Sequence, residues 1–245
     1  GRLMGLMCNL PNSVPAITVD MQCASALMSI EIAYAHIVSG IMDSAIAGGI
    51  ESSSLQPERV YASGDDREGP YKVAQFTPQD QSPLAMLKGA ERTIHKYNVT
   101  KEDLYPHIIG SHQRASAALD NPYLQSYIMP ITIDGKRCID ECIRPTMNEK
   151  LLSRMKPLLG ADSITNAGNA CLTHDGAAFV YLSNKNGPFK IHSVKPWAGN
   201  PQFSPEGALE STEAILKRTG LTMDDIDVVE WNEAFAIIDV LFDKT

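Results

Sequence analysis

Ala16-Ile-Thr-Val-Asp-Met-Gln-Cys-Ala-Ser-Ala-Leu27 decides the fold of this chain, because a predicted strand turns sharply into a helix within it. Alternating branched residues over Val14–Asp20 predict the strand. Apolar residues at helical spacing predict a helix over Ala24–Ser39, which Gly40 ends. The junction places the thiol of Cys23 at a helix N-terminus, where unpaired N–H groups and the helix dipole favour the thiolate. Cys23 is therefore a candidate nucleophile, although an isolated cysteine between apolar residues more often packs in a core.

The segment after this helix completes a predicted strand–helix–strand unit. Ser44–Gly49 is a run of small and apolar residues that predicts a short strand. Two strands joined by a helix in this way should be parallel, with a right-handed crossover. The glycine pair Gly48-Gly49 should let the strand pack closely and has no predicted chemistry of its own.

The middle of the chain, from Gln56 to Leu159, is polar and contains prolines, which predicts an insertion between core elements. Tyr61–Pro70 has the composition of a loop. Two amphipathic helices are predicted over Ser82–Tyr97 and Lys101–Ala118, the second of them preceded by the N-cap sequence Thr100-Lys-Glu-Asp.

The last third of the chain returns to shorter elements. Phe189–Val194 and Ala177–Leu182 predict consecutive strands with a turn at Asn186–Pro188. The remaining predicted elements are a helix over Ser204–Thr219 with Gly220 as its C′ residue, a strand over Ile226–Glu230 and a helix over Glu233–Leu241.

The composition is that of an ordinary globular protein. The chain has 245 residues, of which 44% are apolar and 20% charged, enough for one large or two smaller domains. Its net charge of -8 argues against nucleic acid as a main partner, whereas a local basic patch could still bind a polyanionic small molecule. The sequence shows neither an apolar run of membrane-spanning length nor a signal-peptide layout, so no membrane partner is expected.

The five cysteines, at positions 8, 23, 138, 142 and 171, form an odd and scattered set. This pattern favours a reducing compartment, the cytoplasm, over a disulfide framework. Cys138 and Cys142 are four residues apart, but no second Cys/His pair lies at a ligand-like spacing. No metal site is therefore expected.

Five segments in a fixed order carry a family resemblance. They are Val19–Ala26 around Cys23, Ala47–Ser52, Arg144-Pro145 with Leu152 and Lys156-Pro157, Ala167–Ala170 with Asp175–Ala178, and Asp225–Asp227 running into Asn232–Ala236. In these segments the chain resembles the thiolase family, acyltransferases that form and cleave thioesters of coenzyme A. Each segment alone is weak evidence of a relationship, whereas five segments in the same order make chance similarity improbable.

The resemblance implies an α/β, thiolase-like fold of two related βαβ-rich halves in a layered α-β-α-β-α arrangement, with an inserted loop domain, only partly represented in this chain. Residues 1–55 would end the N-terminal half and carry the nucleophile. Residues 56–160 would form the inserted loop domain around the coenzyme A and acyl pocket. Residues 161–200 would return to the N-terminal half, and residues 201–245 would begin the C-terminal half.

The resemblance also implies site residues. Cys23 would carry the acyl group, and Asn232 would hold a water that helps bind the thioester oxygen. A plainer role for Asn232 and Glu233 is a helix N-cap with a first-turn acid. The substrate-binding positions implied by the family are Met86, Arg144, Ala167, Cys171, Ala234 and Phe235.

Some of these positions depart from the family pattern. Met86 falls in a segment that shapes the acyl pocket, where Leu87 stands for a glycine and Gly89 for a threonine. Cys171 occupies a position usually held by a serine that contacts the pantetheine arm; Leu172 replaces a glycine and His174 an asparagine beside it. The histidines other than His36, which lies in the predicted helix after Cys23, are expected to be solvated or capping residues.

The implied function is that of an acyl-CoA acyltransferase, which condenses two acetyl-CoA molecules to acetoacetyl-CoA or cleaves a 3-ketoacyl-CoA with coenzyme A. Coenzyme A thioesters would be substrates, and no cofactor is expected. Family members usually form homodimers or homotetramers. The alternatives are a thiolase-like protein that binds acyl-CoA without turnover and a relative among the wider condensing enzymes.

The family also has a Gly-His-Pro segment that activates the nucleophile and a Cys-x-Gly segment whose cysteine is an acid/base. Both lie downstream of Asn-Glu-Ala-Phe in the family, and neither occurs in this sequence. The expectation is that the sequence represents part of a longer protein.

Overall fold

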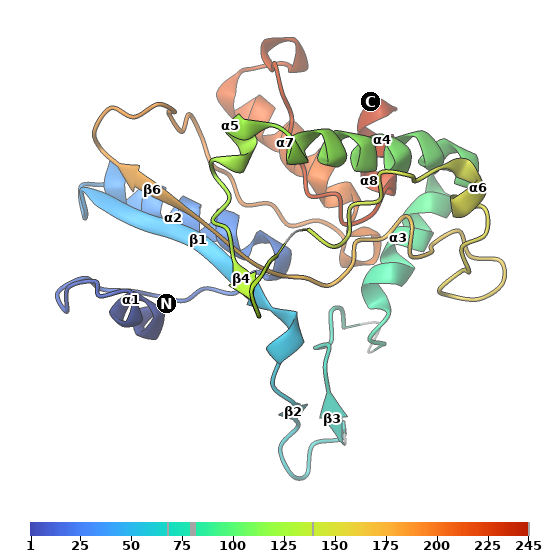
Figure 1. Cartoon of the computed structure of the whole chain (residues 1–245), viewed down its shortest axis with the longest axis horizontal. Helices are drawn as coiled ribbons and strands as arrows, with labels where there is room; N and C mark the ends of the chain where they lie inside the picture. The colour runs from blue at the N-terminus through green and yellow to red at the C-terminus, as the bar shows by residue number, and fades with distance from the viewer. Residues whose placement is uncertain (68, 79–81, 139, 245) are drawn as a thin grey trace. The chain divides into compact units, whose positions relative to one another are not determined.

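The computed structural model describes residues 1–67, 69–78, 82–138 and 140–244, which form two compact units (Figure 1). Unit 1 consists of Gly1–Pro57 and His174–Pro196. Unit 2 consists of Glu58–Thr173 and Trp197–Thr245. Both helices and strands are present, as expected of an α/β protein.

Unit 1 is a two-stranded antiparallel sheet with a helix along one face (Figure 1). The register of the two strands runs from Ser44↔Ser183 to Ser52↔Asp175. In chain order the elements are α1 (Arg2–Met7), the 3-10 turn η1 (Gln22–Ala24), α2 (Ser25–Val38), β1 (Ser44–Ser52), the 3-10 turn η2 (Ser53–Leu55) and β6 (Asp175–Ser183).

The contact between α2 and β1 depends on the glycine pair in the strand. A Cβ atom on Gly49 would lie 3.2 Å from the Cβ of Ala26 on α2, and one on Gly48 would overlap the carbonyl oxygen of Ala178 on β6. The Ser29 hydroxyl accepts the Gly48 N–H at 2.8 Å and is 3.1 Å from the Gly48 carbonyl oxygen. The expectation that these glycines allow close packing is confirmed.

The predicted parallel strand–helix–strand unit is wrong. Val14–Asp20 forms no strand among the described residues, and β1 instead pairs antiparallel with β6. Phe189–Val194 and Ile226–Glu230 are likewise outside any strand in the described part of the chain. Their alternating patterns are compatible with strands, but a strand exists only where a second segment supplies hydrogen-bond partners.

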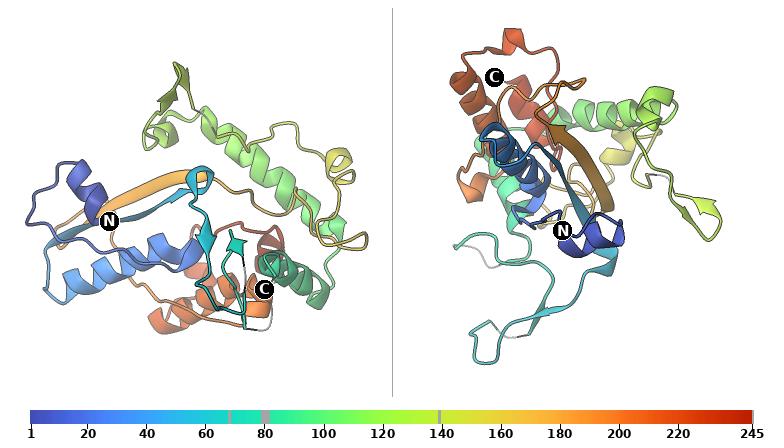
Figure 2. Two further views of the ribbon diagram at one scale, coloured as in Figure 1. Left: turned by 90° about the horizontal axis from the view of Figure 1, so that it is seen from below. Right: turned by 90° about the vertical axis from the view of Figure 1, so that its left-hand side faces the viewer.

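Unit 2 is mainly helical. Its elements are β2 (Arg59–Val60), β3 (Pro70–Tyr71), α3 (Ala85–Lys96), α4 (Lys101–Leu119), α5 (Pro122–Gln125), β4 (Thr132–Ile133), β5 (Lys136–Arg137), α6 (Glu149–Leu152), the 3-10 turn η3 (Pro201–Phe203), α7 (Glu206–Thr219), the 3-10 turn η4 (Met223–Asp225) and α8 (Ile237–Asp243). The short β2–β3 and β4–β5 hairpins extend away from these helices (Figure 2).

The core of unit 2 lies between α3, α4 and α8. Leu104, Ile237 and Leu241 are each 1% exposed, and Ala90 is fully buried. Phe235, just before α8, joins the same cluster. Burying side chains of this size contributes roughly 1.5–3 kcal/mol each, so this cluster is the main source of stability in unit 2.

The predicted helices of unit 2 begin and end where local chemistry places them. Thr100 and Asp103 form a reciprocal capping box at the start of α4. Gly220 ends α7 in the left-handed conformation, at a φ of 72°. The last helix differs from the prediction, because α8 begins at Ile237 and not at Glu233. No helix in the described residues is long and apolar enough to cross a membrane.

Candidate functional site

Cys23 lies in a tight turn that leads into α2. It is the middle residue of η1, and its thiol is exposed. The preceding residue, Gln22, adopts a φ of 50°, in the left-handed region that residues other than glycine rarely occupy. This conformation turns the chain from the extended segment into the helix within one residue.

Short-range hydrogen bonds hold this turn. The N–H of Gln22 donates to a carboxylate oxygen of Asp20 at 2.9 Å, and the N–H of Met21 donates to the Ser25 hydroxyl at 2.8 Å. The Ser25 hydroxyl in turn donates to the Gln22 carbonyl at 2.6 Å. The strained residue before Cys23 is therefore fixed from both sides.

Asn232 lies in an irregular loop of unit 2, and its side chain is exposed. The plainer expectation of an N-cap is wrong, because the residue before α8 is Ala236 and the loop makes a tight turn in which the Ala234 N–H donates to the Asn232 carbonyl at 2.8 Å. The loop is held by β-type contacts instead of a helical turn. Ala170 and Phe235 form an antiparallel bridge, and the Cys171 N–H donates to the Ala234 carbonyl at 2.9 Å.

The structure therefore brings several predicted residues together. Cys171, Ala234, Phe235 and Asn232 lie on two adjacent backbone segments of unit 2, and the exposed residue Ala167 lies in the turn just before Cys171. Met86 and Leu87, on α3, pack against the core cluster that contains Phe235.

Helix α4 contacts both this loop and the segment of Arg144. Glu233 accepts the Ser111 hydroxyl at 2.5 Å and is 3.4 Å from the Arg114 guanidinium. His112, which follows Ser111 on α4, accepts the Arg144 backbone N–H at its Nδ1 atom, at 3.2 Å. Partial burial and the nearby Arg144 charge lower the pKa of His112. This histidine is thus no solvated residue, contrary to the sequence expectation.

The predicted nucleophile belongs to unit 1, whereas the other predicted site residues belong to unit 2. No disulfide joins the five cysteines, all of which the structure describes. Within the described residues there is also no group of three or more His, Cys, Asp or Glu side chains that could hold a metal ion.

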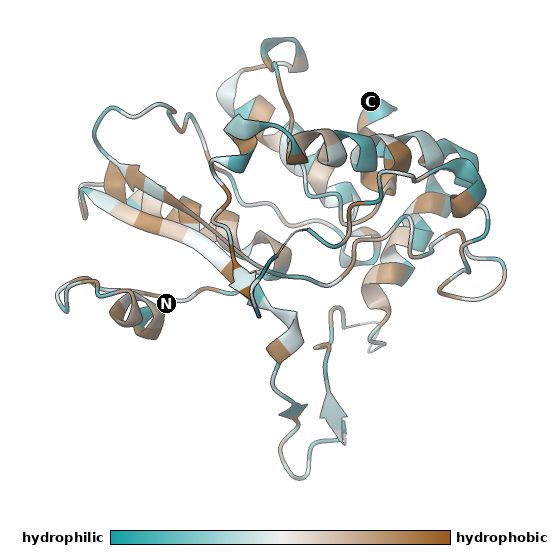
Figure 3. Ribbon diagram, viewed as in Figure 1, coloured by the Kyte–Doolittle hydropathy of each residue, from teal (hydrophilic) through white to brown (hydrophobic). Residues whose placement is uncertain are grey.

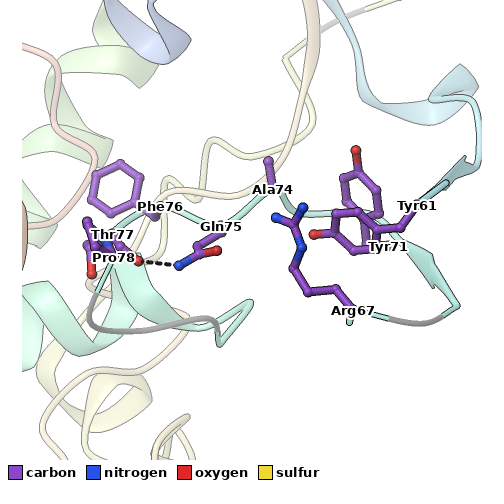
Figure 4. Close-up of a pocket in the computed structure, with 8 residues that line it drawn as sticks. All are labelled: Tyr61, Arg67, Tyr71, Ala74, Gln75, Phe76, Thr77 and Pro78. Atoms are coloured by element: carbon purple, nitrogen blue, oxygen red, sulfur yellow. Dashed lines mark hydrogen bonds between the residues drawn. The ribbon is translucent and has the colours of Figure 1, made fainter. Parts of the chain in front are cut away.

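Unit 2 also has an open pocket of about 650 Å³ beside its β2–β3 hairpin (Figure 4). The rings of Tyr61 and Tyr71 stack there with centroids 4.3 Å apart, and the Arg67 guanidinium lies 4.2 Å from the Tyr61 ring. Hydrogen bonds from Arg67 lower the pKa of Asp65 to about 2. The described residues that line the pocket are Tyr61, Arg67, Tyr71, Ala74, Gln75, Phe76, Thr77 and Pro78. None of these is a predicted site residue.

The family model of the thiolase N-terminal domain matches residues 1–186 of this sequence. The chain belongs to the thiolase family. This match confirms the resemblance that was stated from the five ordered segments. The solved structures described below confirm the thiolase-like fold.

Two curated thiolases illustrate the similarity in sequence. The chain is 32% identical over 257 residues to a 3-ketoacyl-CoA thiolase of Bacillus subtilis, covering 96% of this chain and 64% of that protein. It is 30% identical over 252 residues to the steroid 3-ketoacyl-CoA thiolase FadA6 of Mycobacterium tuberculosis, covering 96% of this chain and 61% of that protein. The chain thus spans less than two thirds of the length of these relatives.

A solved thiolase shares the fold over nearly the whole chain. This structure is human mitochondrial 3-ketoacyl-CoA thiolase, crystallised in complex with CoA. The match has a TM-score of 0.86 and 26% sequence identity, and it covers 99% of the present chain and 65% of the human chain. The Bacillus anthracis acetyl-CoA acetyltransferase, at 23% identity and a TM-score of 0.83, shows the same fold.

Sequence reasoning missed residues that form hydrogen bonds with the segments of the predicted site residues. Ser111 and His112 lie on α4, far from the recognised motifs, and only their contacts with Glu233 and Arg144 draw attention to them. Gln22 carries no sequence signal for a left-handed conformation. Glu91 belongs to the recognised segment that begins at Met86, but the sequence did not indicate its hydrogen-bond partners, which lie 73 and 74 residues away.

Proposed function

We propose that this protein is an acyl-CoA acyltransferase of the thiolase type, with Cys23 as the acyl carrier. The observation that carries the proposal is the exposed thiol in the tight turn before α2, in a chain of the thiolase family. In the first step the Cys23 thiolate attacks the thioester carbonyl. A new C–S bond forms to Cys23, the C–S bond to coenzyme A breaks, and the coenzyme A thiolate leaves and takes up a proton.

The second step decides the net reaction. In condensation, a general base takes a proton from the methyl carbon of a second acetyl-CoA, and the resulting carbanion attacks the acyl-cysteine. The new C–C bond gives acetoacetyl-CoA and returns the Cys23 thiolate. Thiolysis of a 3-ketoacyl-CoA runs through the same steps in reverse, so one acyl-Cys23 intermediate serves both directions.

Negative charge develops on the carbonyl oxygen in both directions and needs donors already in place. We assign this role to the backbone N–H of Cys23 and to a water held by Asn232. The exposed position of the Asn232 side chain leaves it accessible to such a water.

We assign the remaining predicted residues to substrate binding. Arg144 would contact the nucleotide part of coenzyme A, because it is an exposed residue and a guanidinium can pair with phosphate. Cys171, Ala167, Ala234 and Phe235 would line the pantetheine and acyl path along the two bridged segments, with Met86 behind them.

The proposed oligomeric state follows from the family, and the proposed compartment follows from the cysteines. We propose a homodimer or homotetramer that works in the cytoplasm, a reducing compartment in which five cysteines without disulfides are stable. Coenzyme A thioesters are substrates in this proposal and no cofactor is required.

The test is covalent labelling of the protein by acetyl-CoA or acetoacetyl-CoA, followed by intact-mass and peptide-mass analysis. We expect one acetyl group on Cys23. The variant Cys23→Ala should lose the adduct and at least about 10³-fold of thiolysis activity, while Cys8→Ala, which removes another exposed thiol of unit 1, should keep both. An adduct that persists in Cys23→Ala would refute the proposal, and acyl-CoA binding without adduct or turnover would instead indicate a binding protein.

A further inference from the structure

We infer that Glu91 is a positioning residue for the acyl-CoA site of unit 2. The inference rests on the proposed function, because it concerns how the segments assigned to substrate binding are held. Glu91 lies on α3, faces away from solvent and connects this helix to the turn that carries Ala167.

The Glu91 carboxylate accepts three hydrogen bonds from two consecutive residues, Ile164 and Thr165. Its Oε1 atom accepts the Ile164 N–H at 2.8 Å and lies 3.1 Å from the His95 Nε2 atom. Its Oε2 atom accepts the Thr165 N–H at 2.8 Å and the Thr165 hydroxyl at 2.5 Å. The Glu91 side chain is only 12% exposed and Thr165 is fully buried. Two consecutive backbone amides are therefore fixed to α3.

The fixed amides hold the next turn in place. The Asn169 side chain donates to the Ile164 carbonyl at 2.9 Å and accepts the Asn166 N–H at 2.9 Å. These two bonds close the turn on whose outer side Ala167 is exposed. Asn166 and Asn169 are each 6% exposed, so water cannot easily replace the bonds.

The turn at residues 166–169 also holds the Asn232 loop. The Asn169 carbonyl accepts the Ala236 N–H at 3.0 Å, and the Cys171 N–H donates to the Ala234 carbonyl at 2.9 Å. With the Ala170–Phe235 bridge, these bonds set the position of the loop that begins at Asn232. A continuous set of hydrogen bonds thus runs from Glu91 to the backbone of the proposed oxyanion and substrate residues.

The arrangement requires an ionised carboxylate. Partial burial opposes ionisation, but the donors from Thr165 and Ile164 outweigh it, and the pKa of Glu91 lies below its ordinary value. A glutamine at position 91 has one acceptor oxygen, so its NH₂ group would face either the Ile164 or the Thr165 donors. One buried amide would lose its partner, and the segment would have to move.

Lys96 offers a matched control on the same helix. Its Nζ atom donates to Glu206 at 2.6 Å and connects α3 to α7, away from the Ile164–Cys171 segment. Lys96→Met therefore removes an ion pair from α3 without touching the proposed site. If Glu91 acted only on stability, Glu91→Gln and Lys96→Met would have the same kind of effect.

The first experiment compares the two variants with the wild type by kinetics, well below their melting temperatures. We expect Glu91→Gln to lower kcat/KM for the acyl-CoA by roughly 10- to 100-fold, since a small displacement of positioned groups is costly to catalysis. Lys96→Met should stay within about twofold of the wild type, because its contacts lie outside the site. Thr165→Ser, which keeps the hydroxyl donor, should retain activity that Thr165→Val loses. An unchanged kcat/KM in Glu91→Gln would overturn the inference.

The second experiment measures amide hydrogen exchange and needs no activity. In Glu91→Gln, peptides that contain Cys171 and Ala236 should exchange at least about tenfold faster than in the wild type, and in Lys96→Met they should not. Equal exchange in Glu91→Gln and the wild type would refute the coupling. If the wild type shows no acyl transfer but exchange responds as expected, the proposed function fails and the positioning role of Glu91 stands.

Discussion

At the scale of single residues, the conformation of Gln22 is the feature that places Cys23. A left-handed backbone costs a residue other than glycine about 1–2 kcal/mol. The hydrogen bonds that the Gln22 backbone forms with the side chains of Asp20 and Ser25 offset this cost. The thiol is therefore presented by a turn that is strained and locally supported.

Substitutions of Gln22 should separate strain from side-chain chemistry. Gln22→Val should destabilise the protein by about 1–2 kcal/mol, because a β-branched residue fits the left-handed region poorly. Gln22→Gly should change stability by less than about 1 kcal/mol, since relief of strain and greater freedom of the unfolded chain oppose one another. Chemical denaturation measures both, and alkylation of Cys23 by iodoacetamide should be slower in the valine variant. Equal stability of the two variants would contradict the strained turn.

At the scale of elements, α8 carries an acid in an apolar setting. Asp239 is 6% exposed and accepts the Trp231 indole N–H at 3.2 Å. Burial, with the charge of Glu233 nearby, raises its pKa to about 6. The folded protein thus holds this proton more tightly than the unfolded chain does, where an ordinary value of 3.8 applies.

The sign of this shift gives a pH prediction. Because the folded state binds the proton more tightly, stability should fall as the pH rises from about 4 to about 6 and level off above that. Asp239→Asn keeps the acceptor for Trp231 and removes the charge, so it should stabilise the protein at pH 8 by at most about 3 kcal/mol and by almost nothing at pH 4. Thermal unfolding at both pH values measures the difference. The exposed Glu213→Gln on α7 is the control, and a gain of equal size at both pH values would refute the assignment.

At the scale of the whole molecule, the two units differ in how much apolar surface they bury. The core cluster lies entirely in unit 2. In unit 1 the sheet face opposite α2 carries Ile46, Ile50, Phe179 and Tyr181, which are between 47% and 70% exposed. Figure 3 shows apolar residues alternating with less apolar ones along β1.

This difference predicts unequal local stability in the chain described here. Amides of β1 and β6 should exchange with solvent at least about tenfold faster than amides of α3 and α4, because few buried apolar contacts oppose opening of the sheet. Hydrogen exchange followed by mass spectrometry compares the two regions directly. Equal protection would show that another surface covers the apolar face of the sheet.

The sequence by itself determined the features that depend on near neighbours. It predicted the helices that became α2, α3, α4 and α7, the caps at Thr100 and Gly220, and a cysteine at the start of a helix. Helical periodicity, capping and glycine conformations are interactions over a few residues, so the order of amino acids carries them. Five ordered motifs were also enough to recognise the thiolase family.

Only the tertiary structure decided which segments pair as strands and which hydrogen bonds form around the predicted site residues. β1 pairs antiparallel with β6, which lies more than 120 residues later in the sequence, while Val14–Asp20, with an equally suitable pattern, stays unpaired among the described residues. The partners of Glu91 and His112 are also distant in sequence. Strand pairing and buried hydrogen bonds depend on which distant groups folding brings within about 3 Å, and a local pattern cannot specify that.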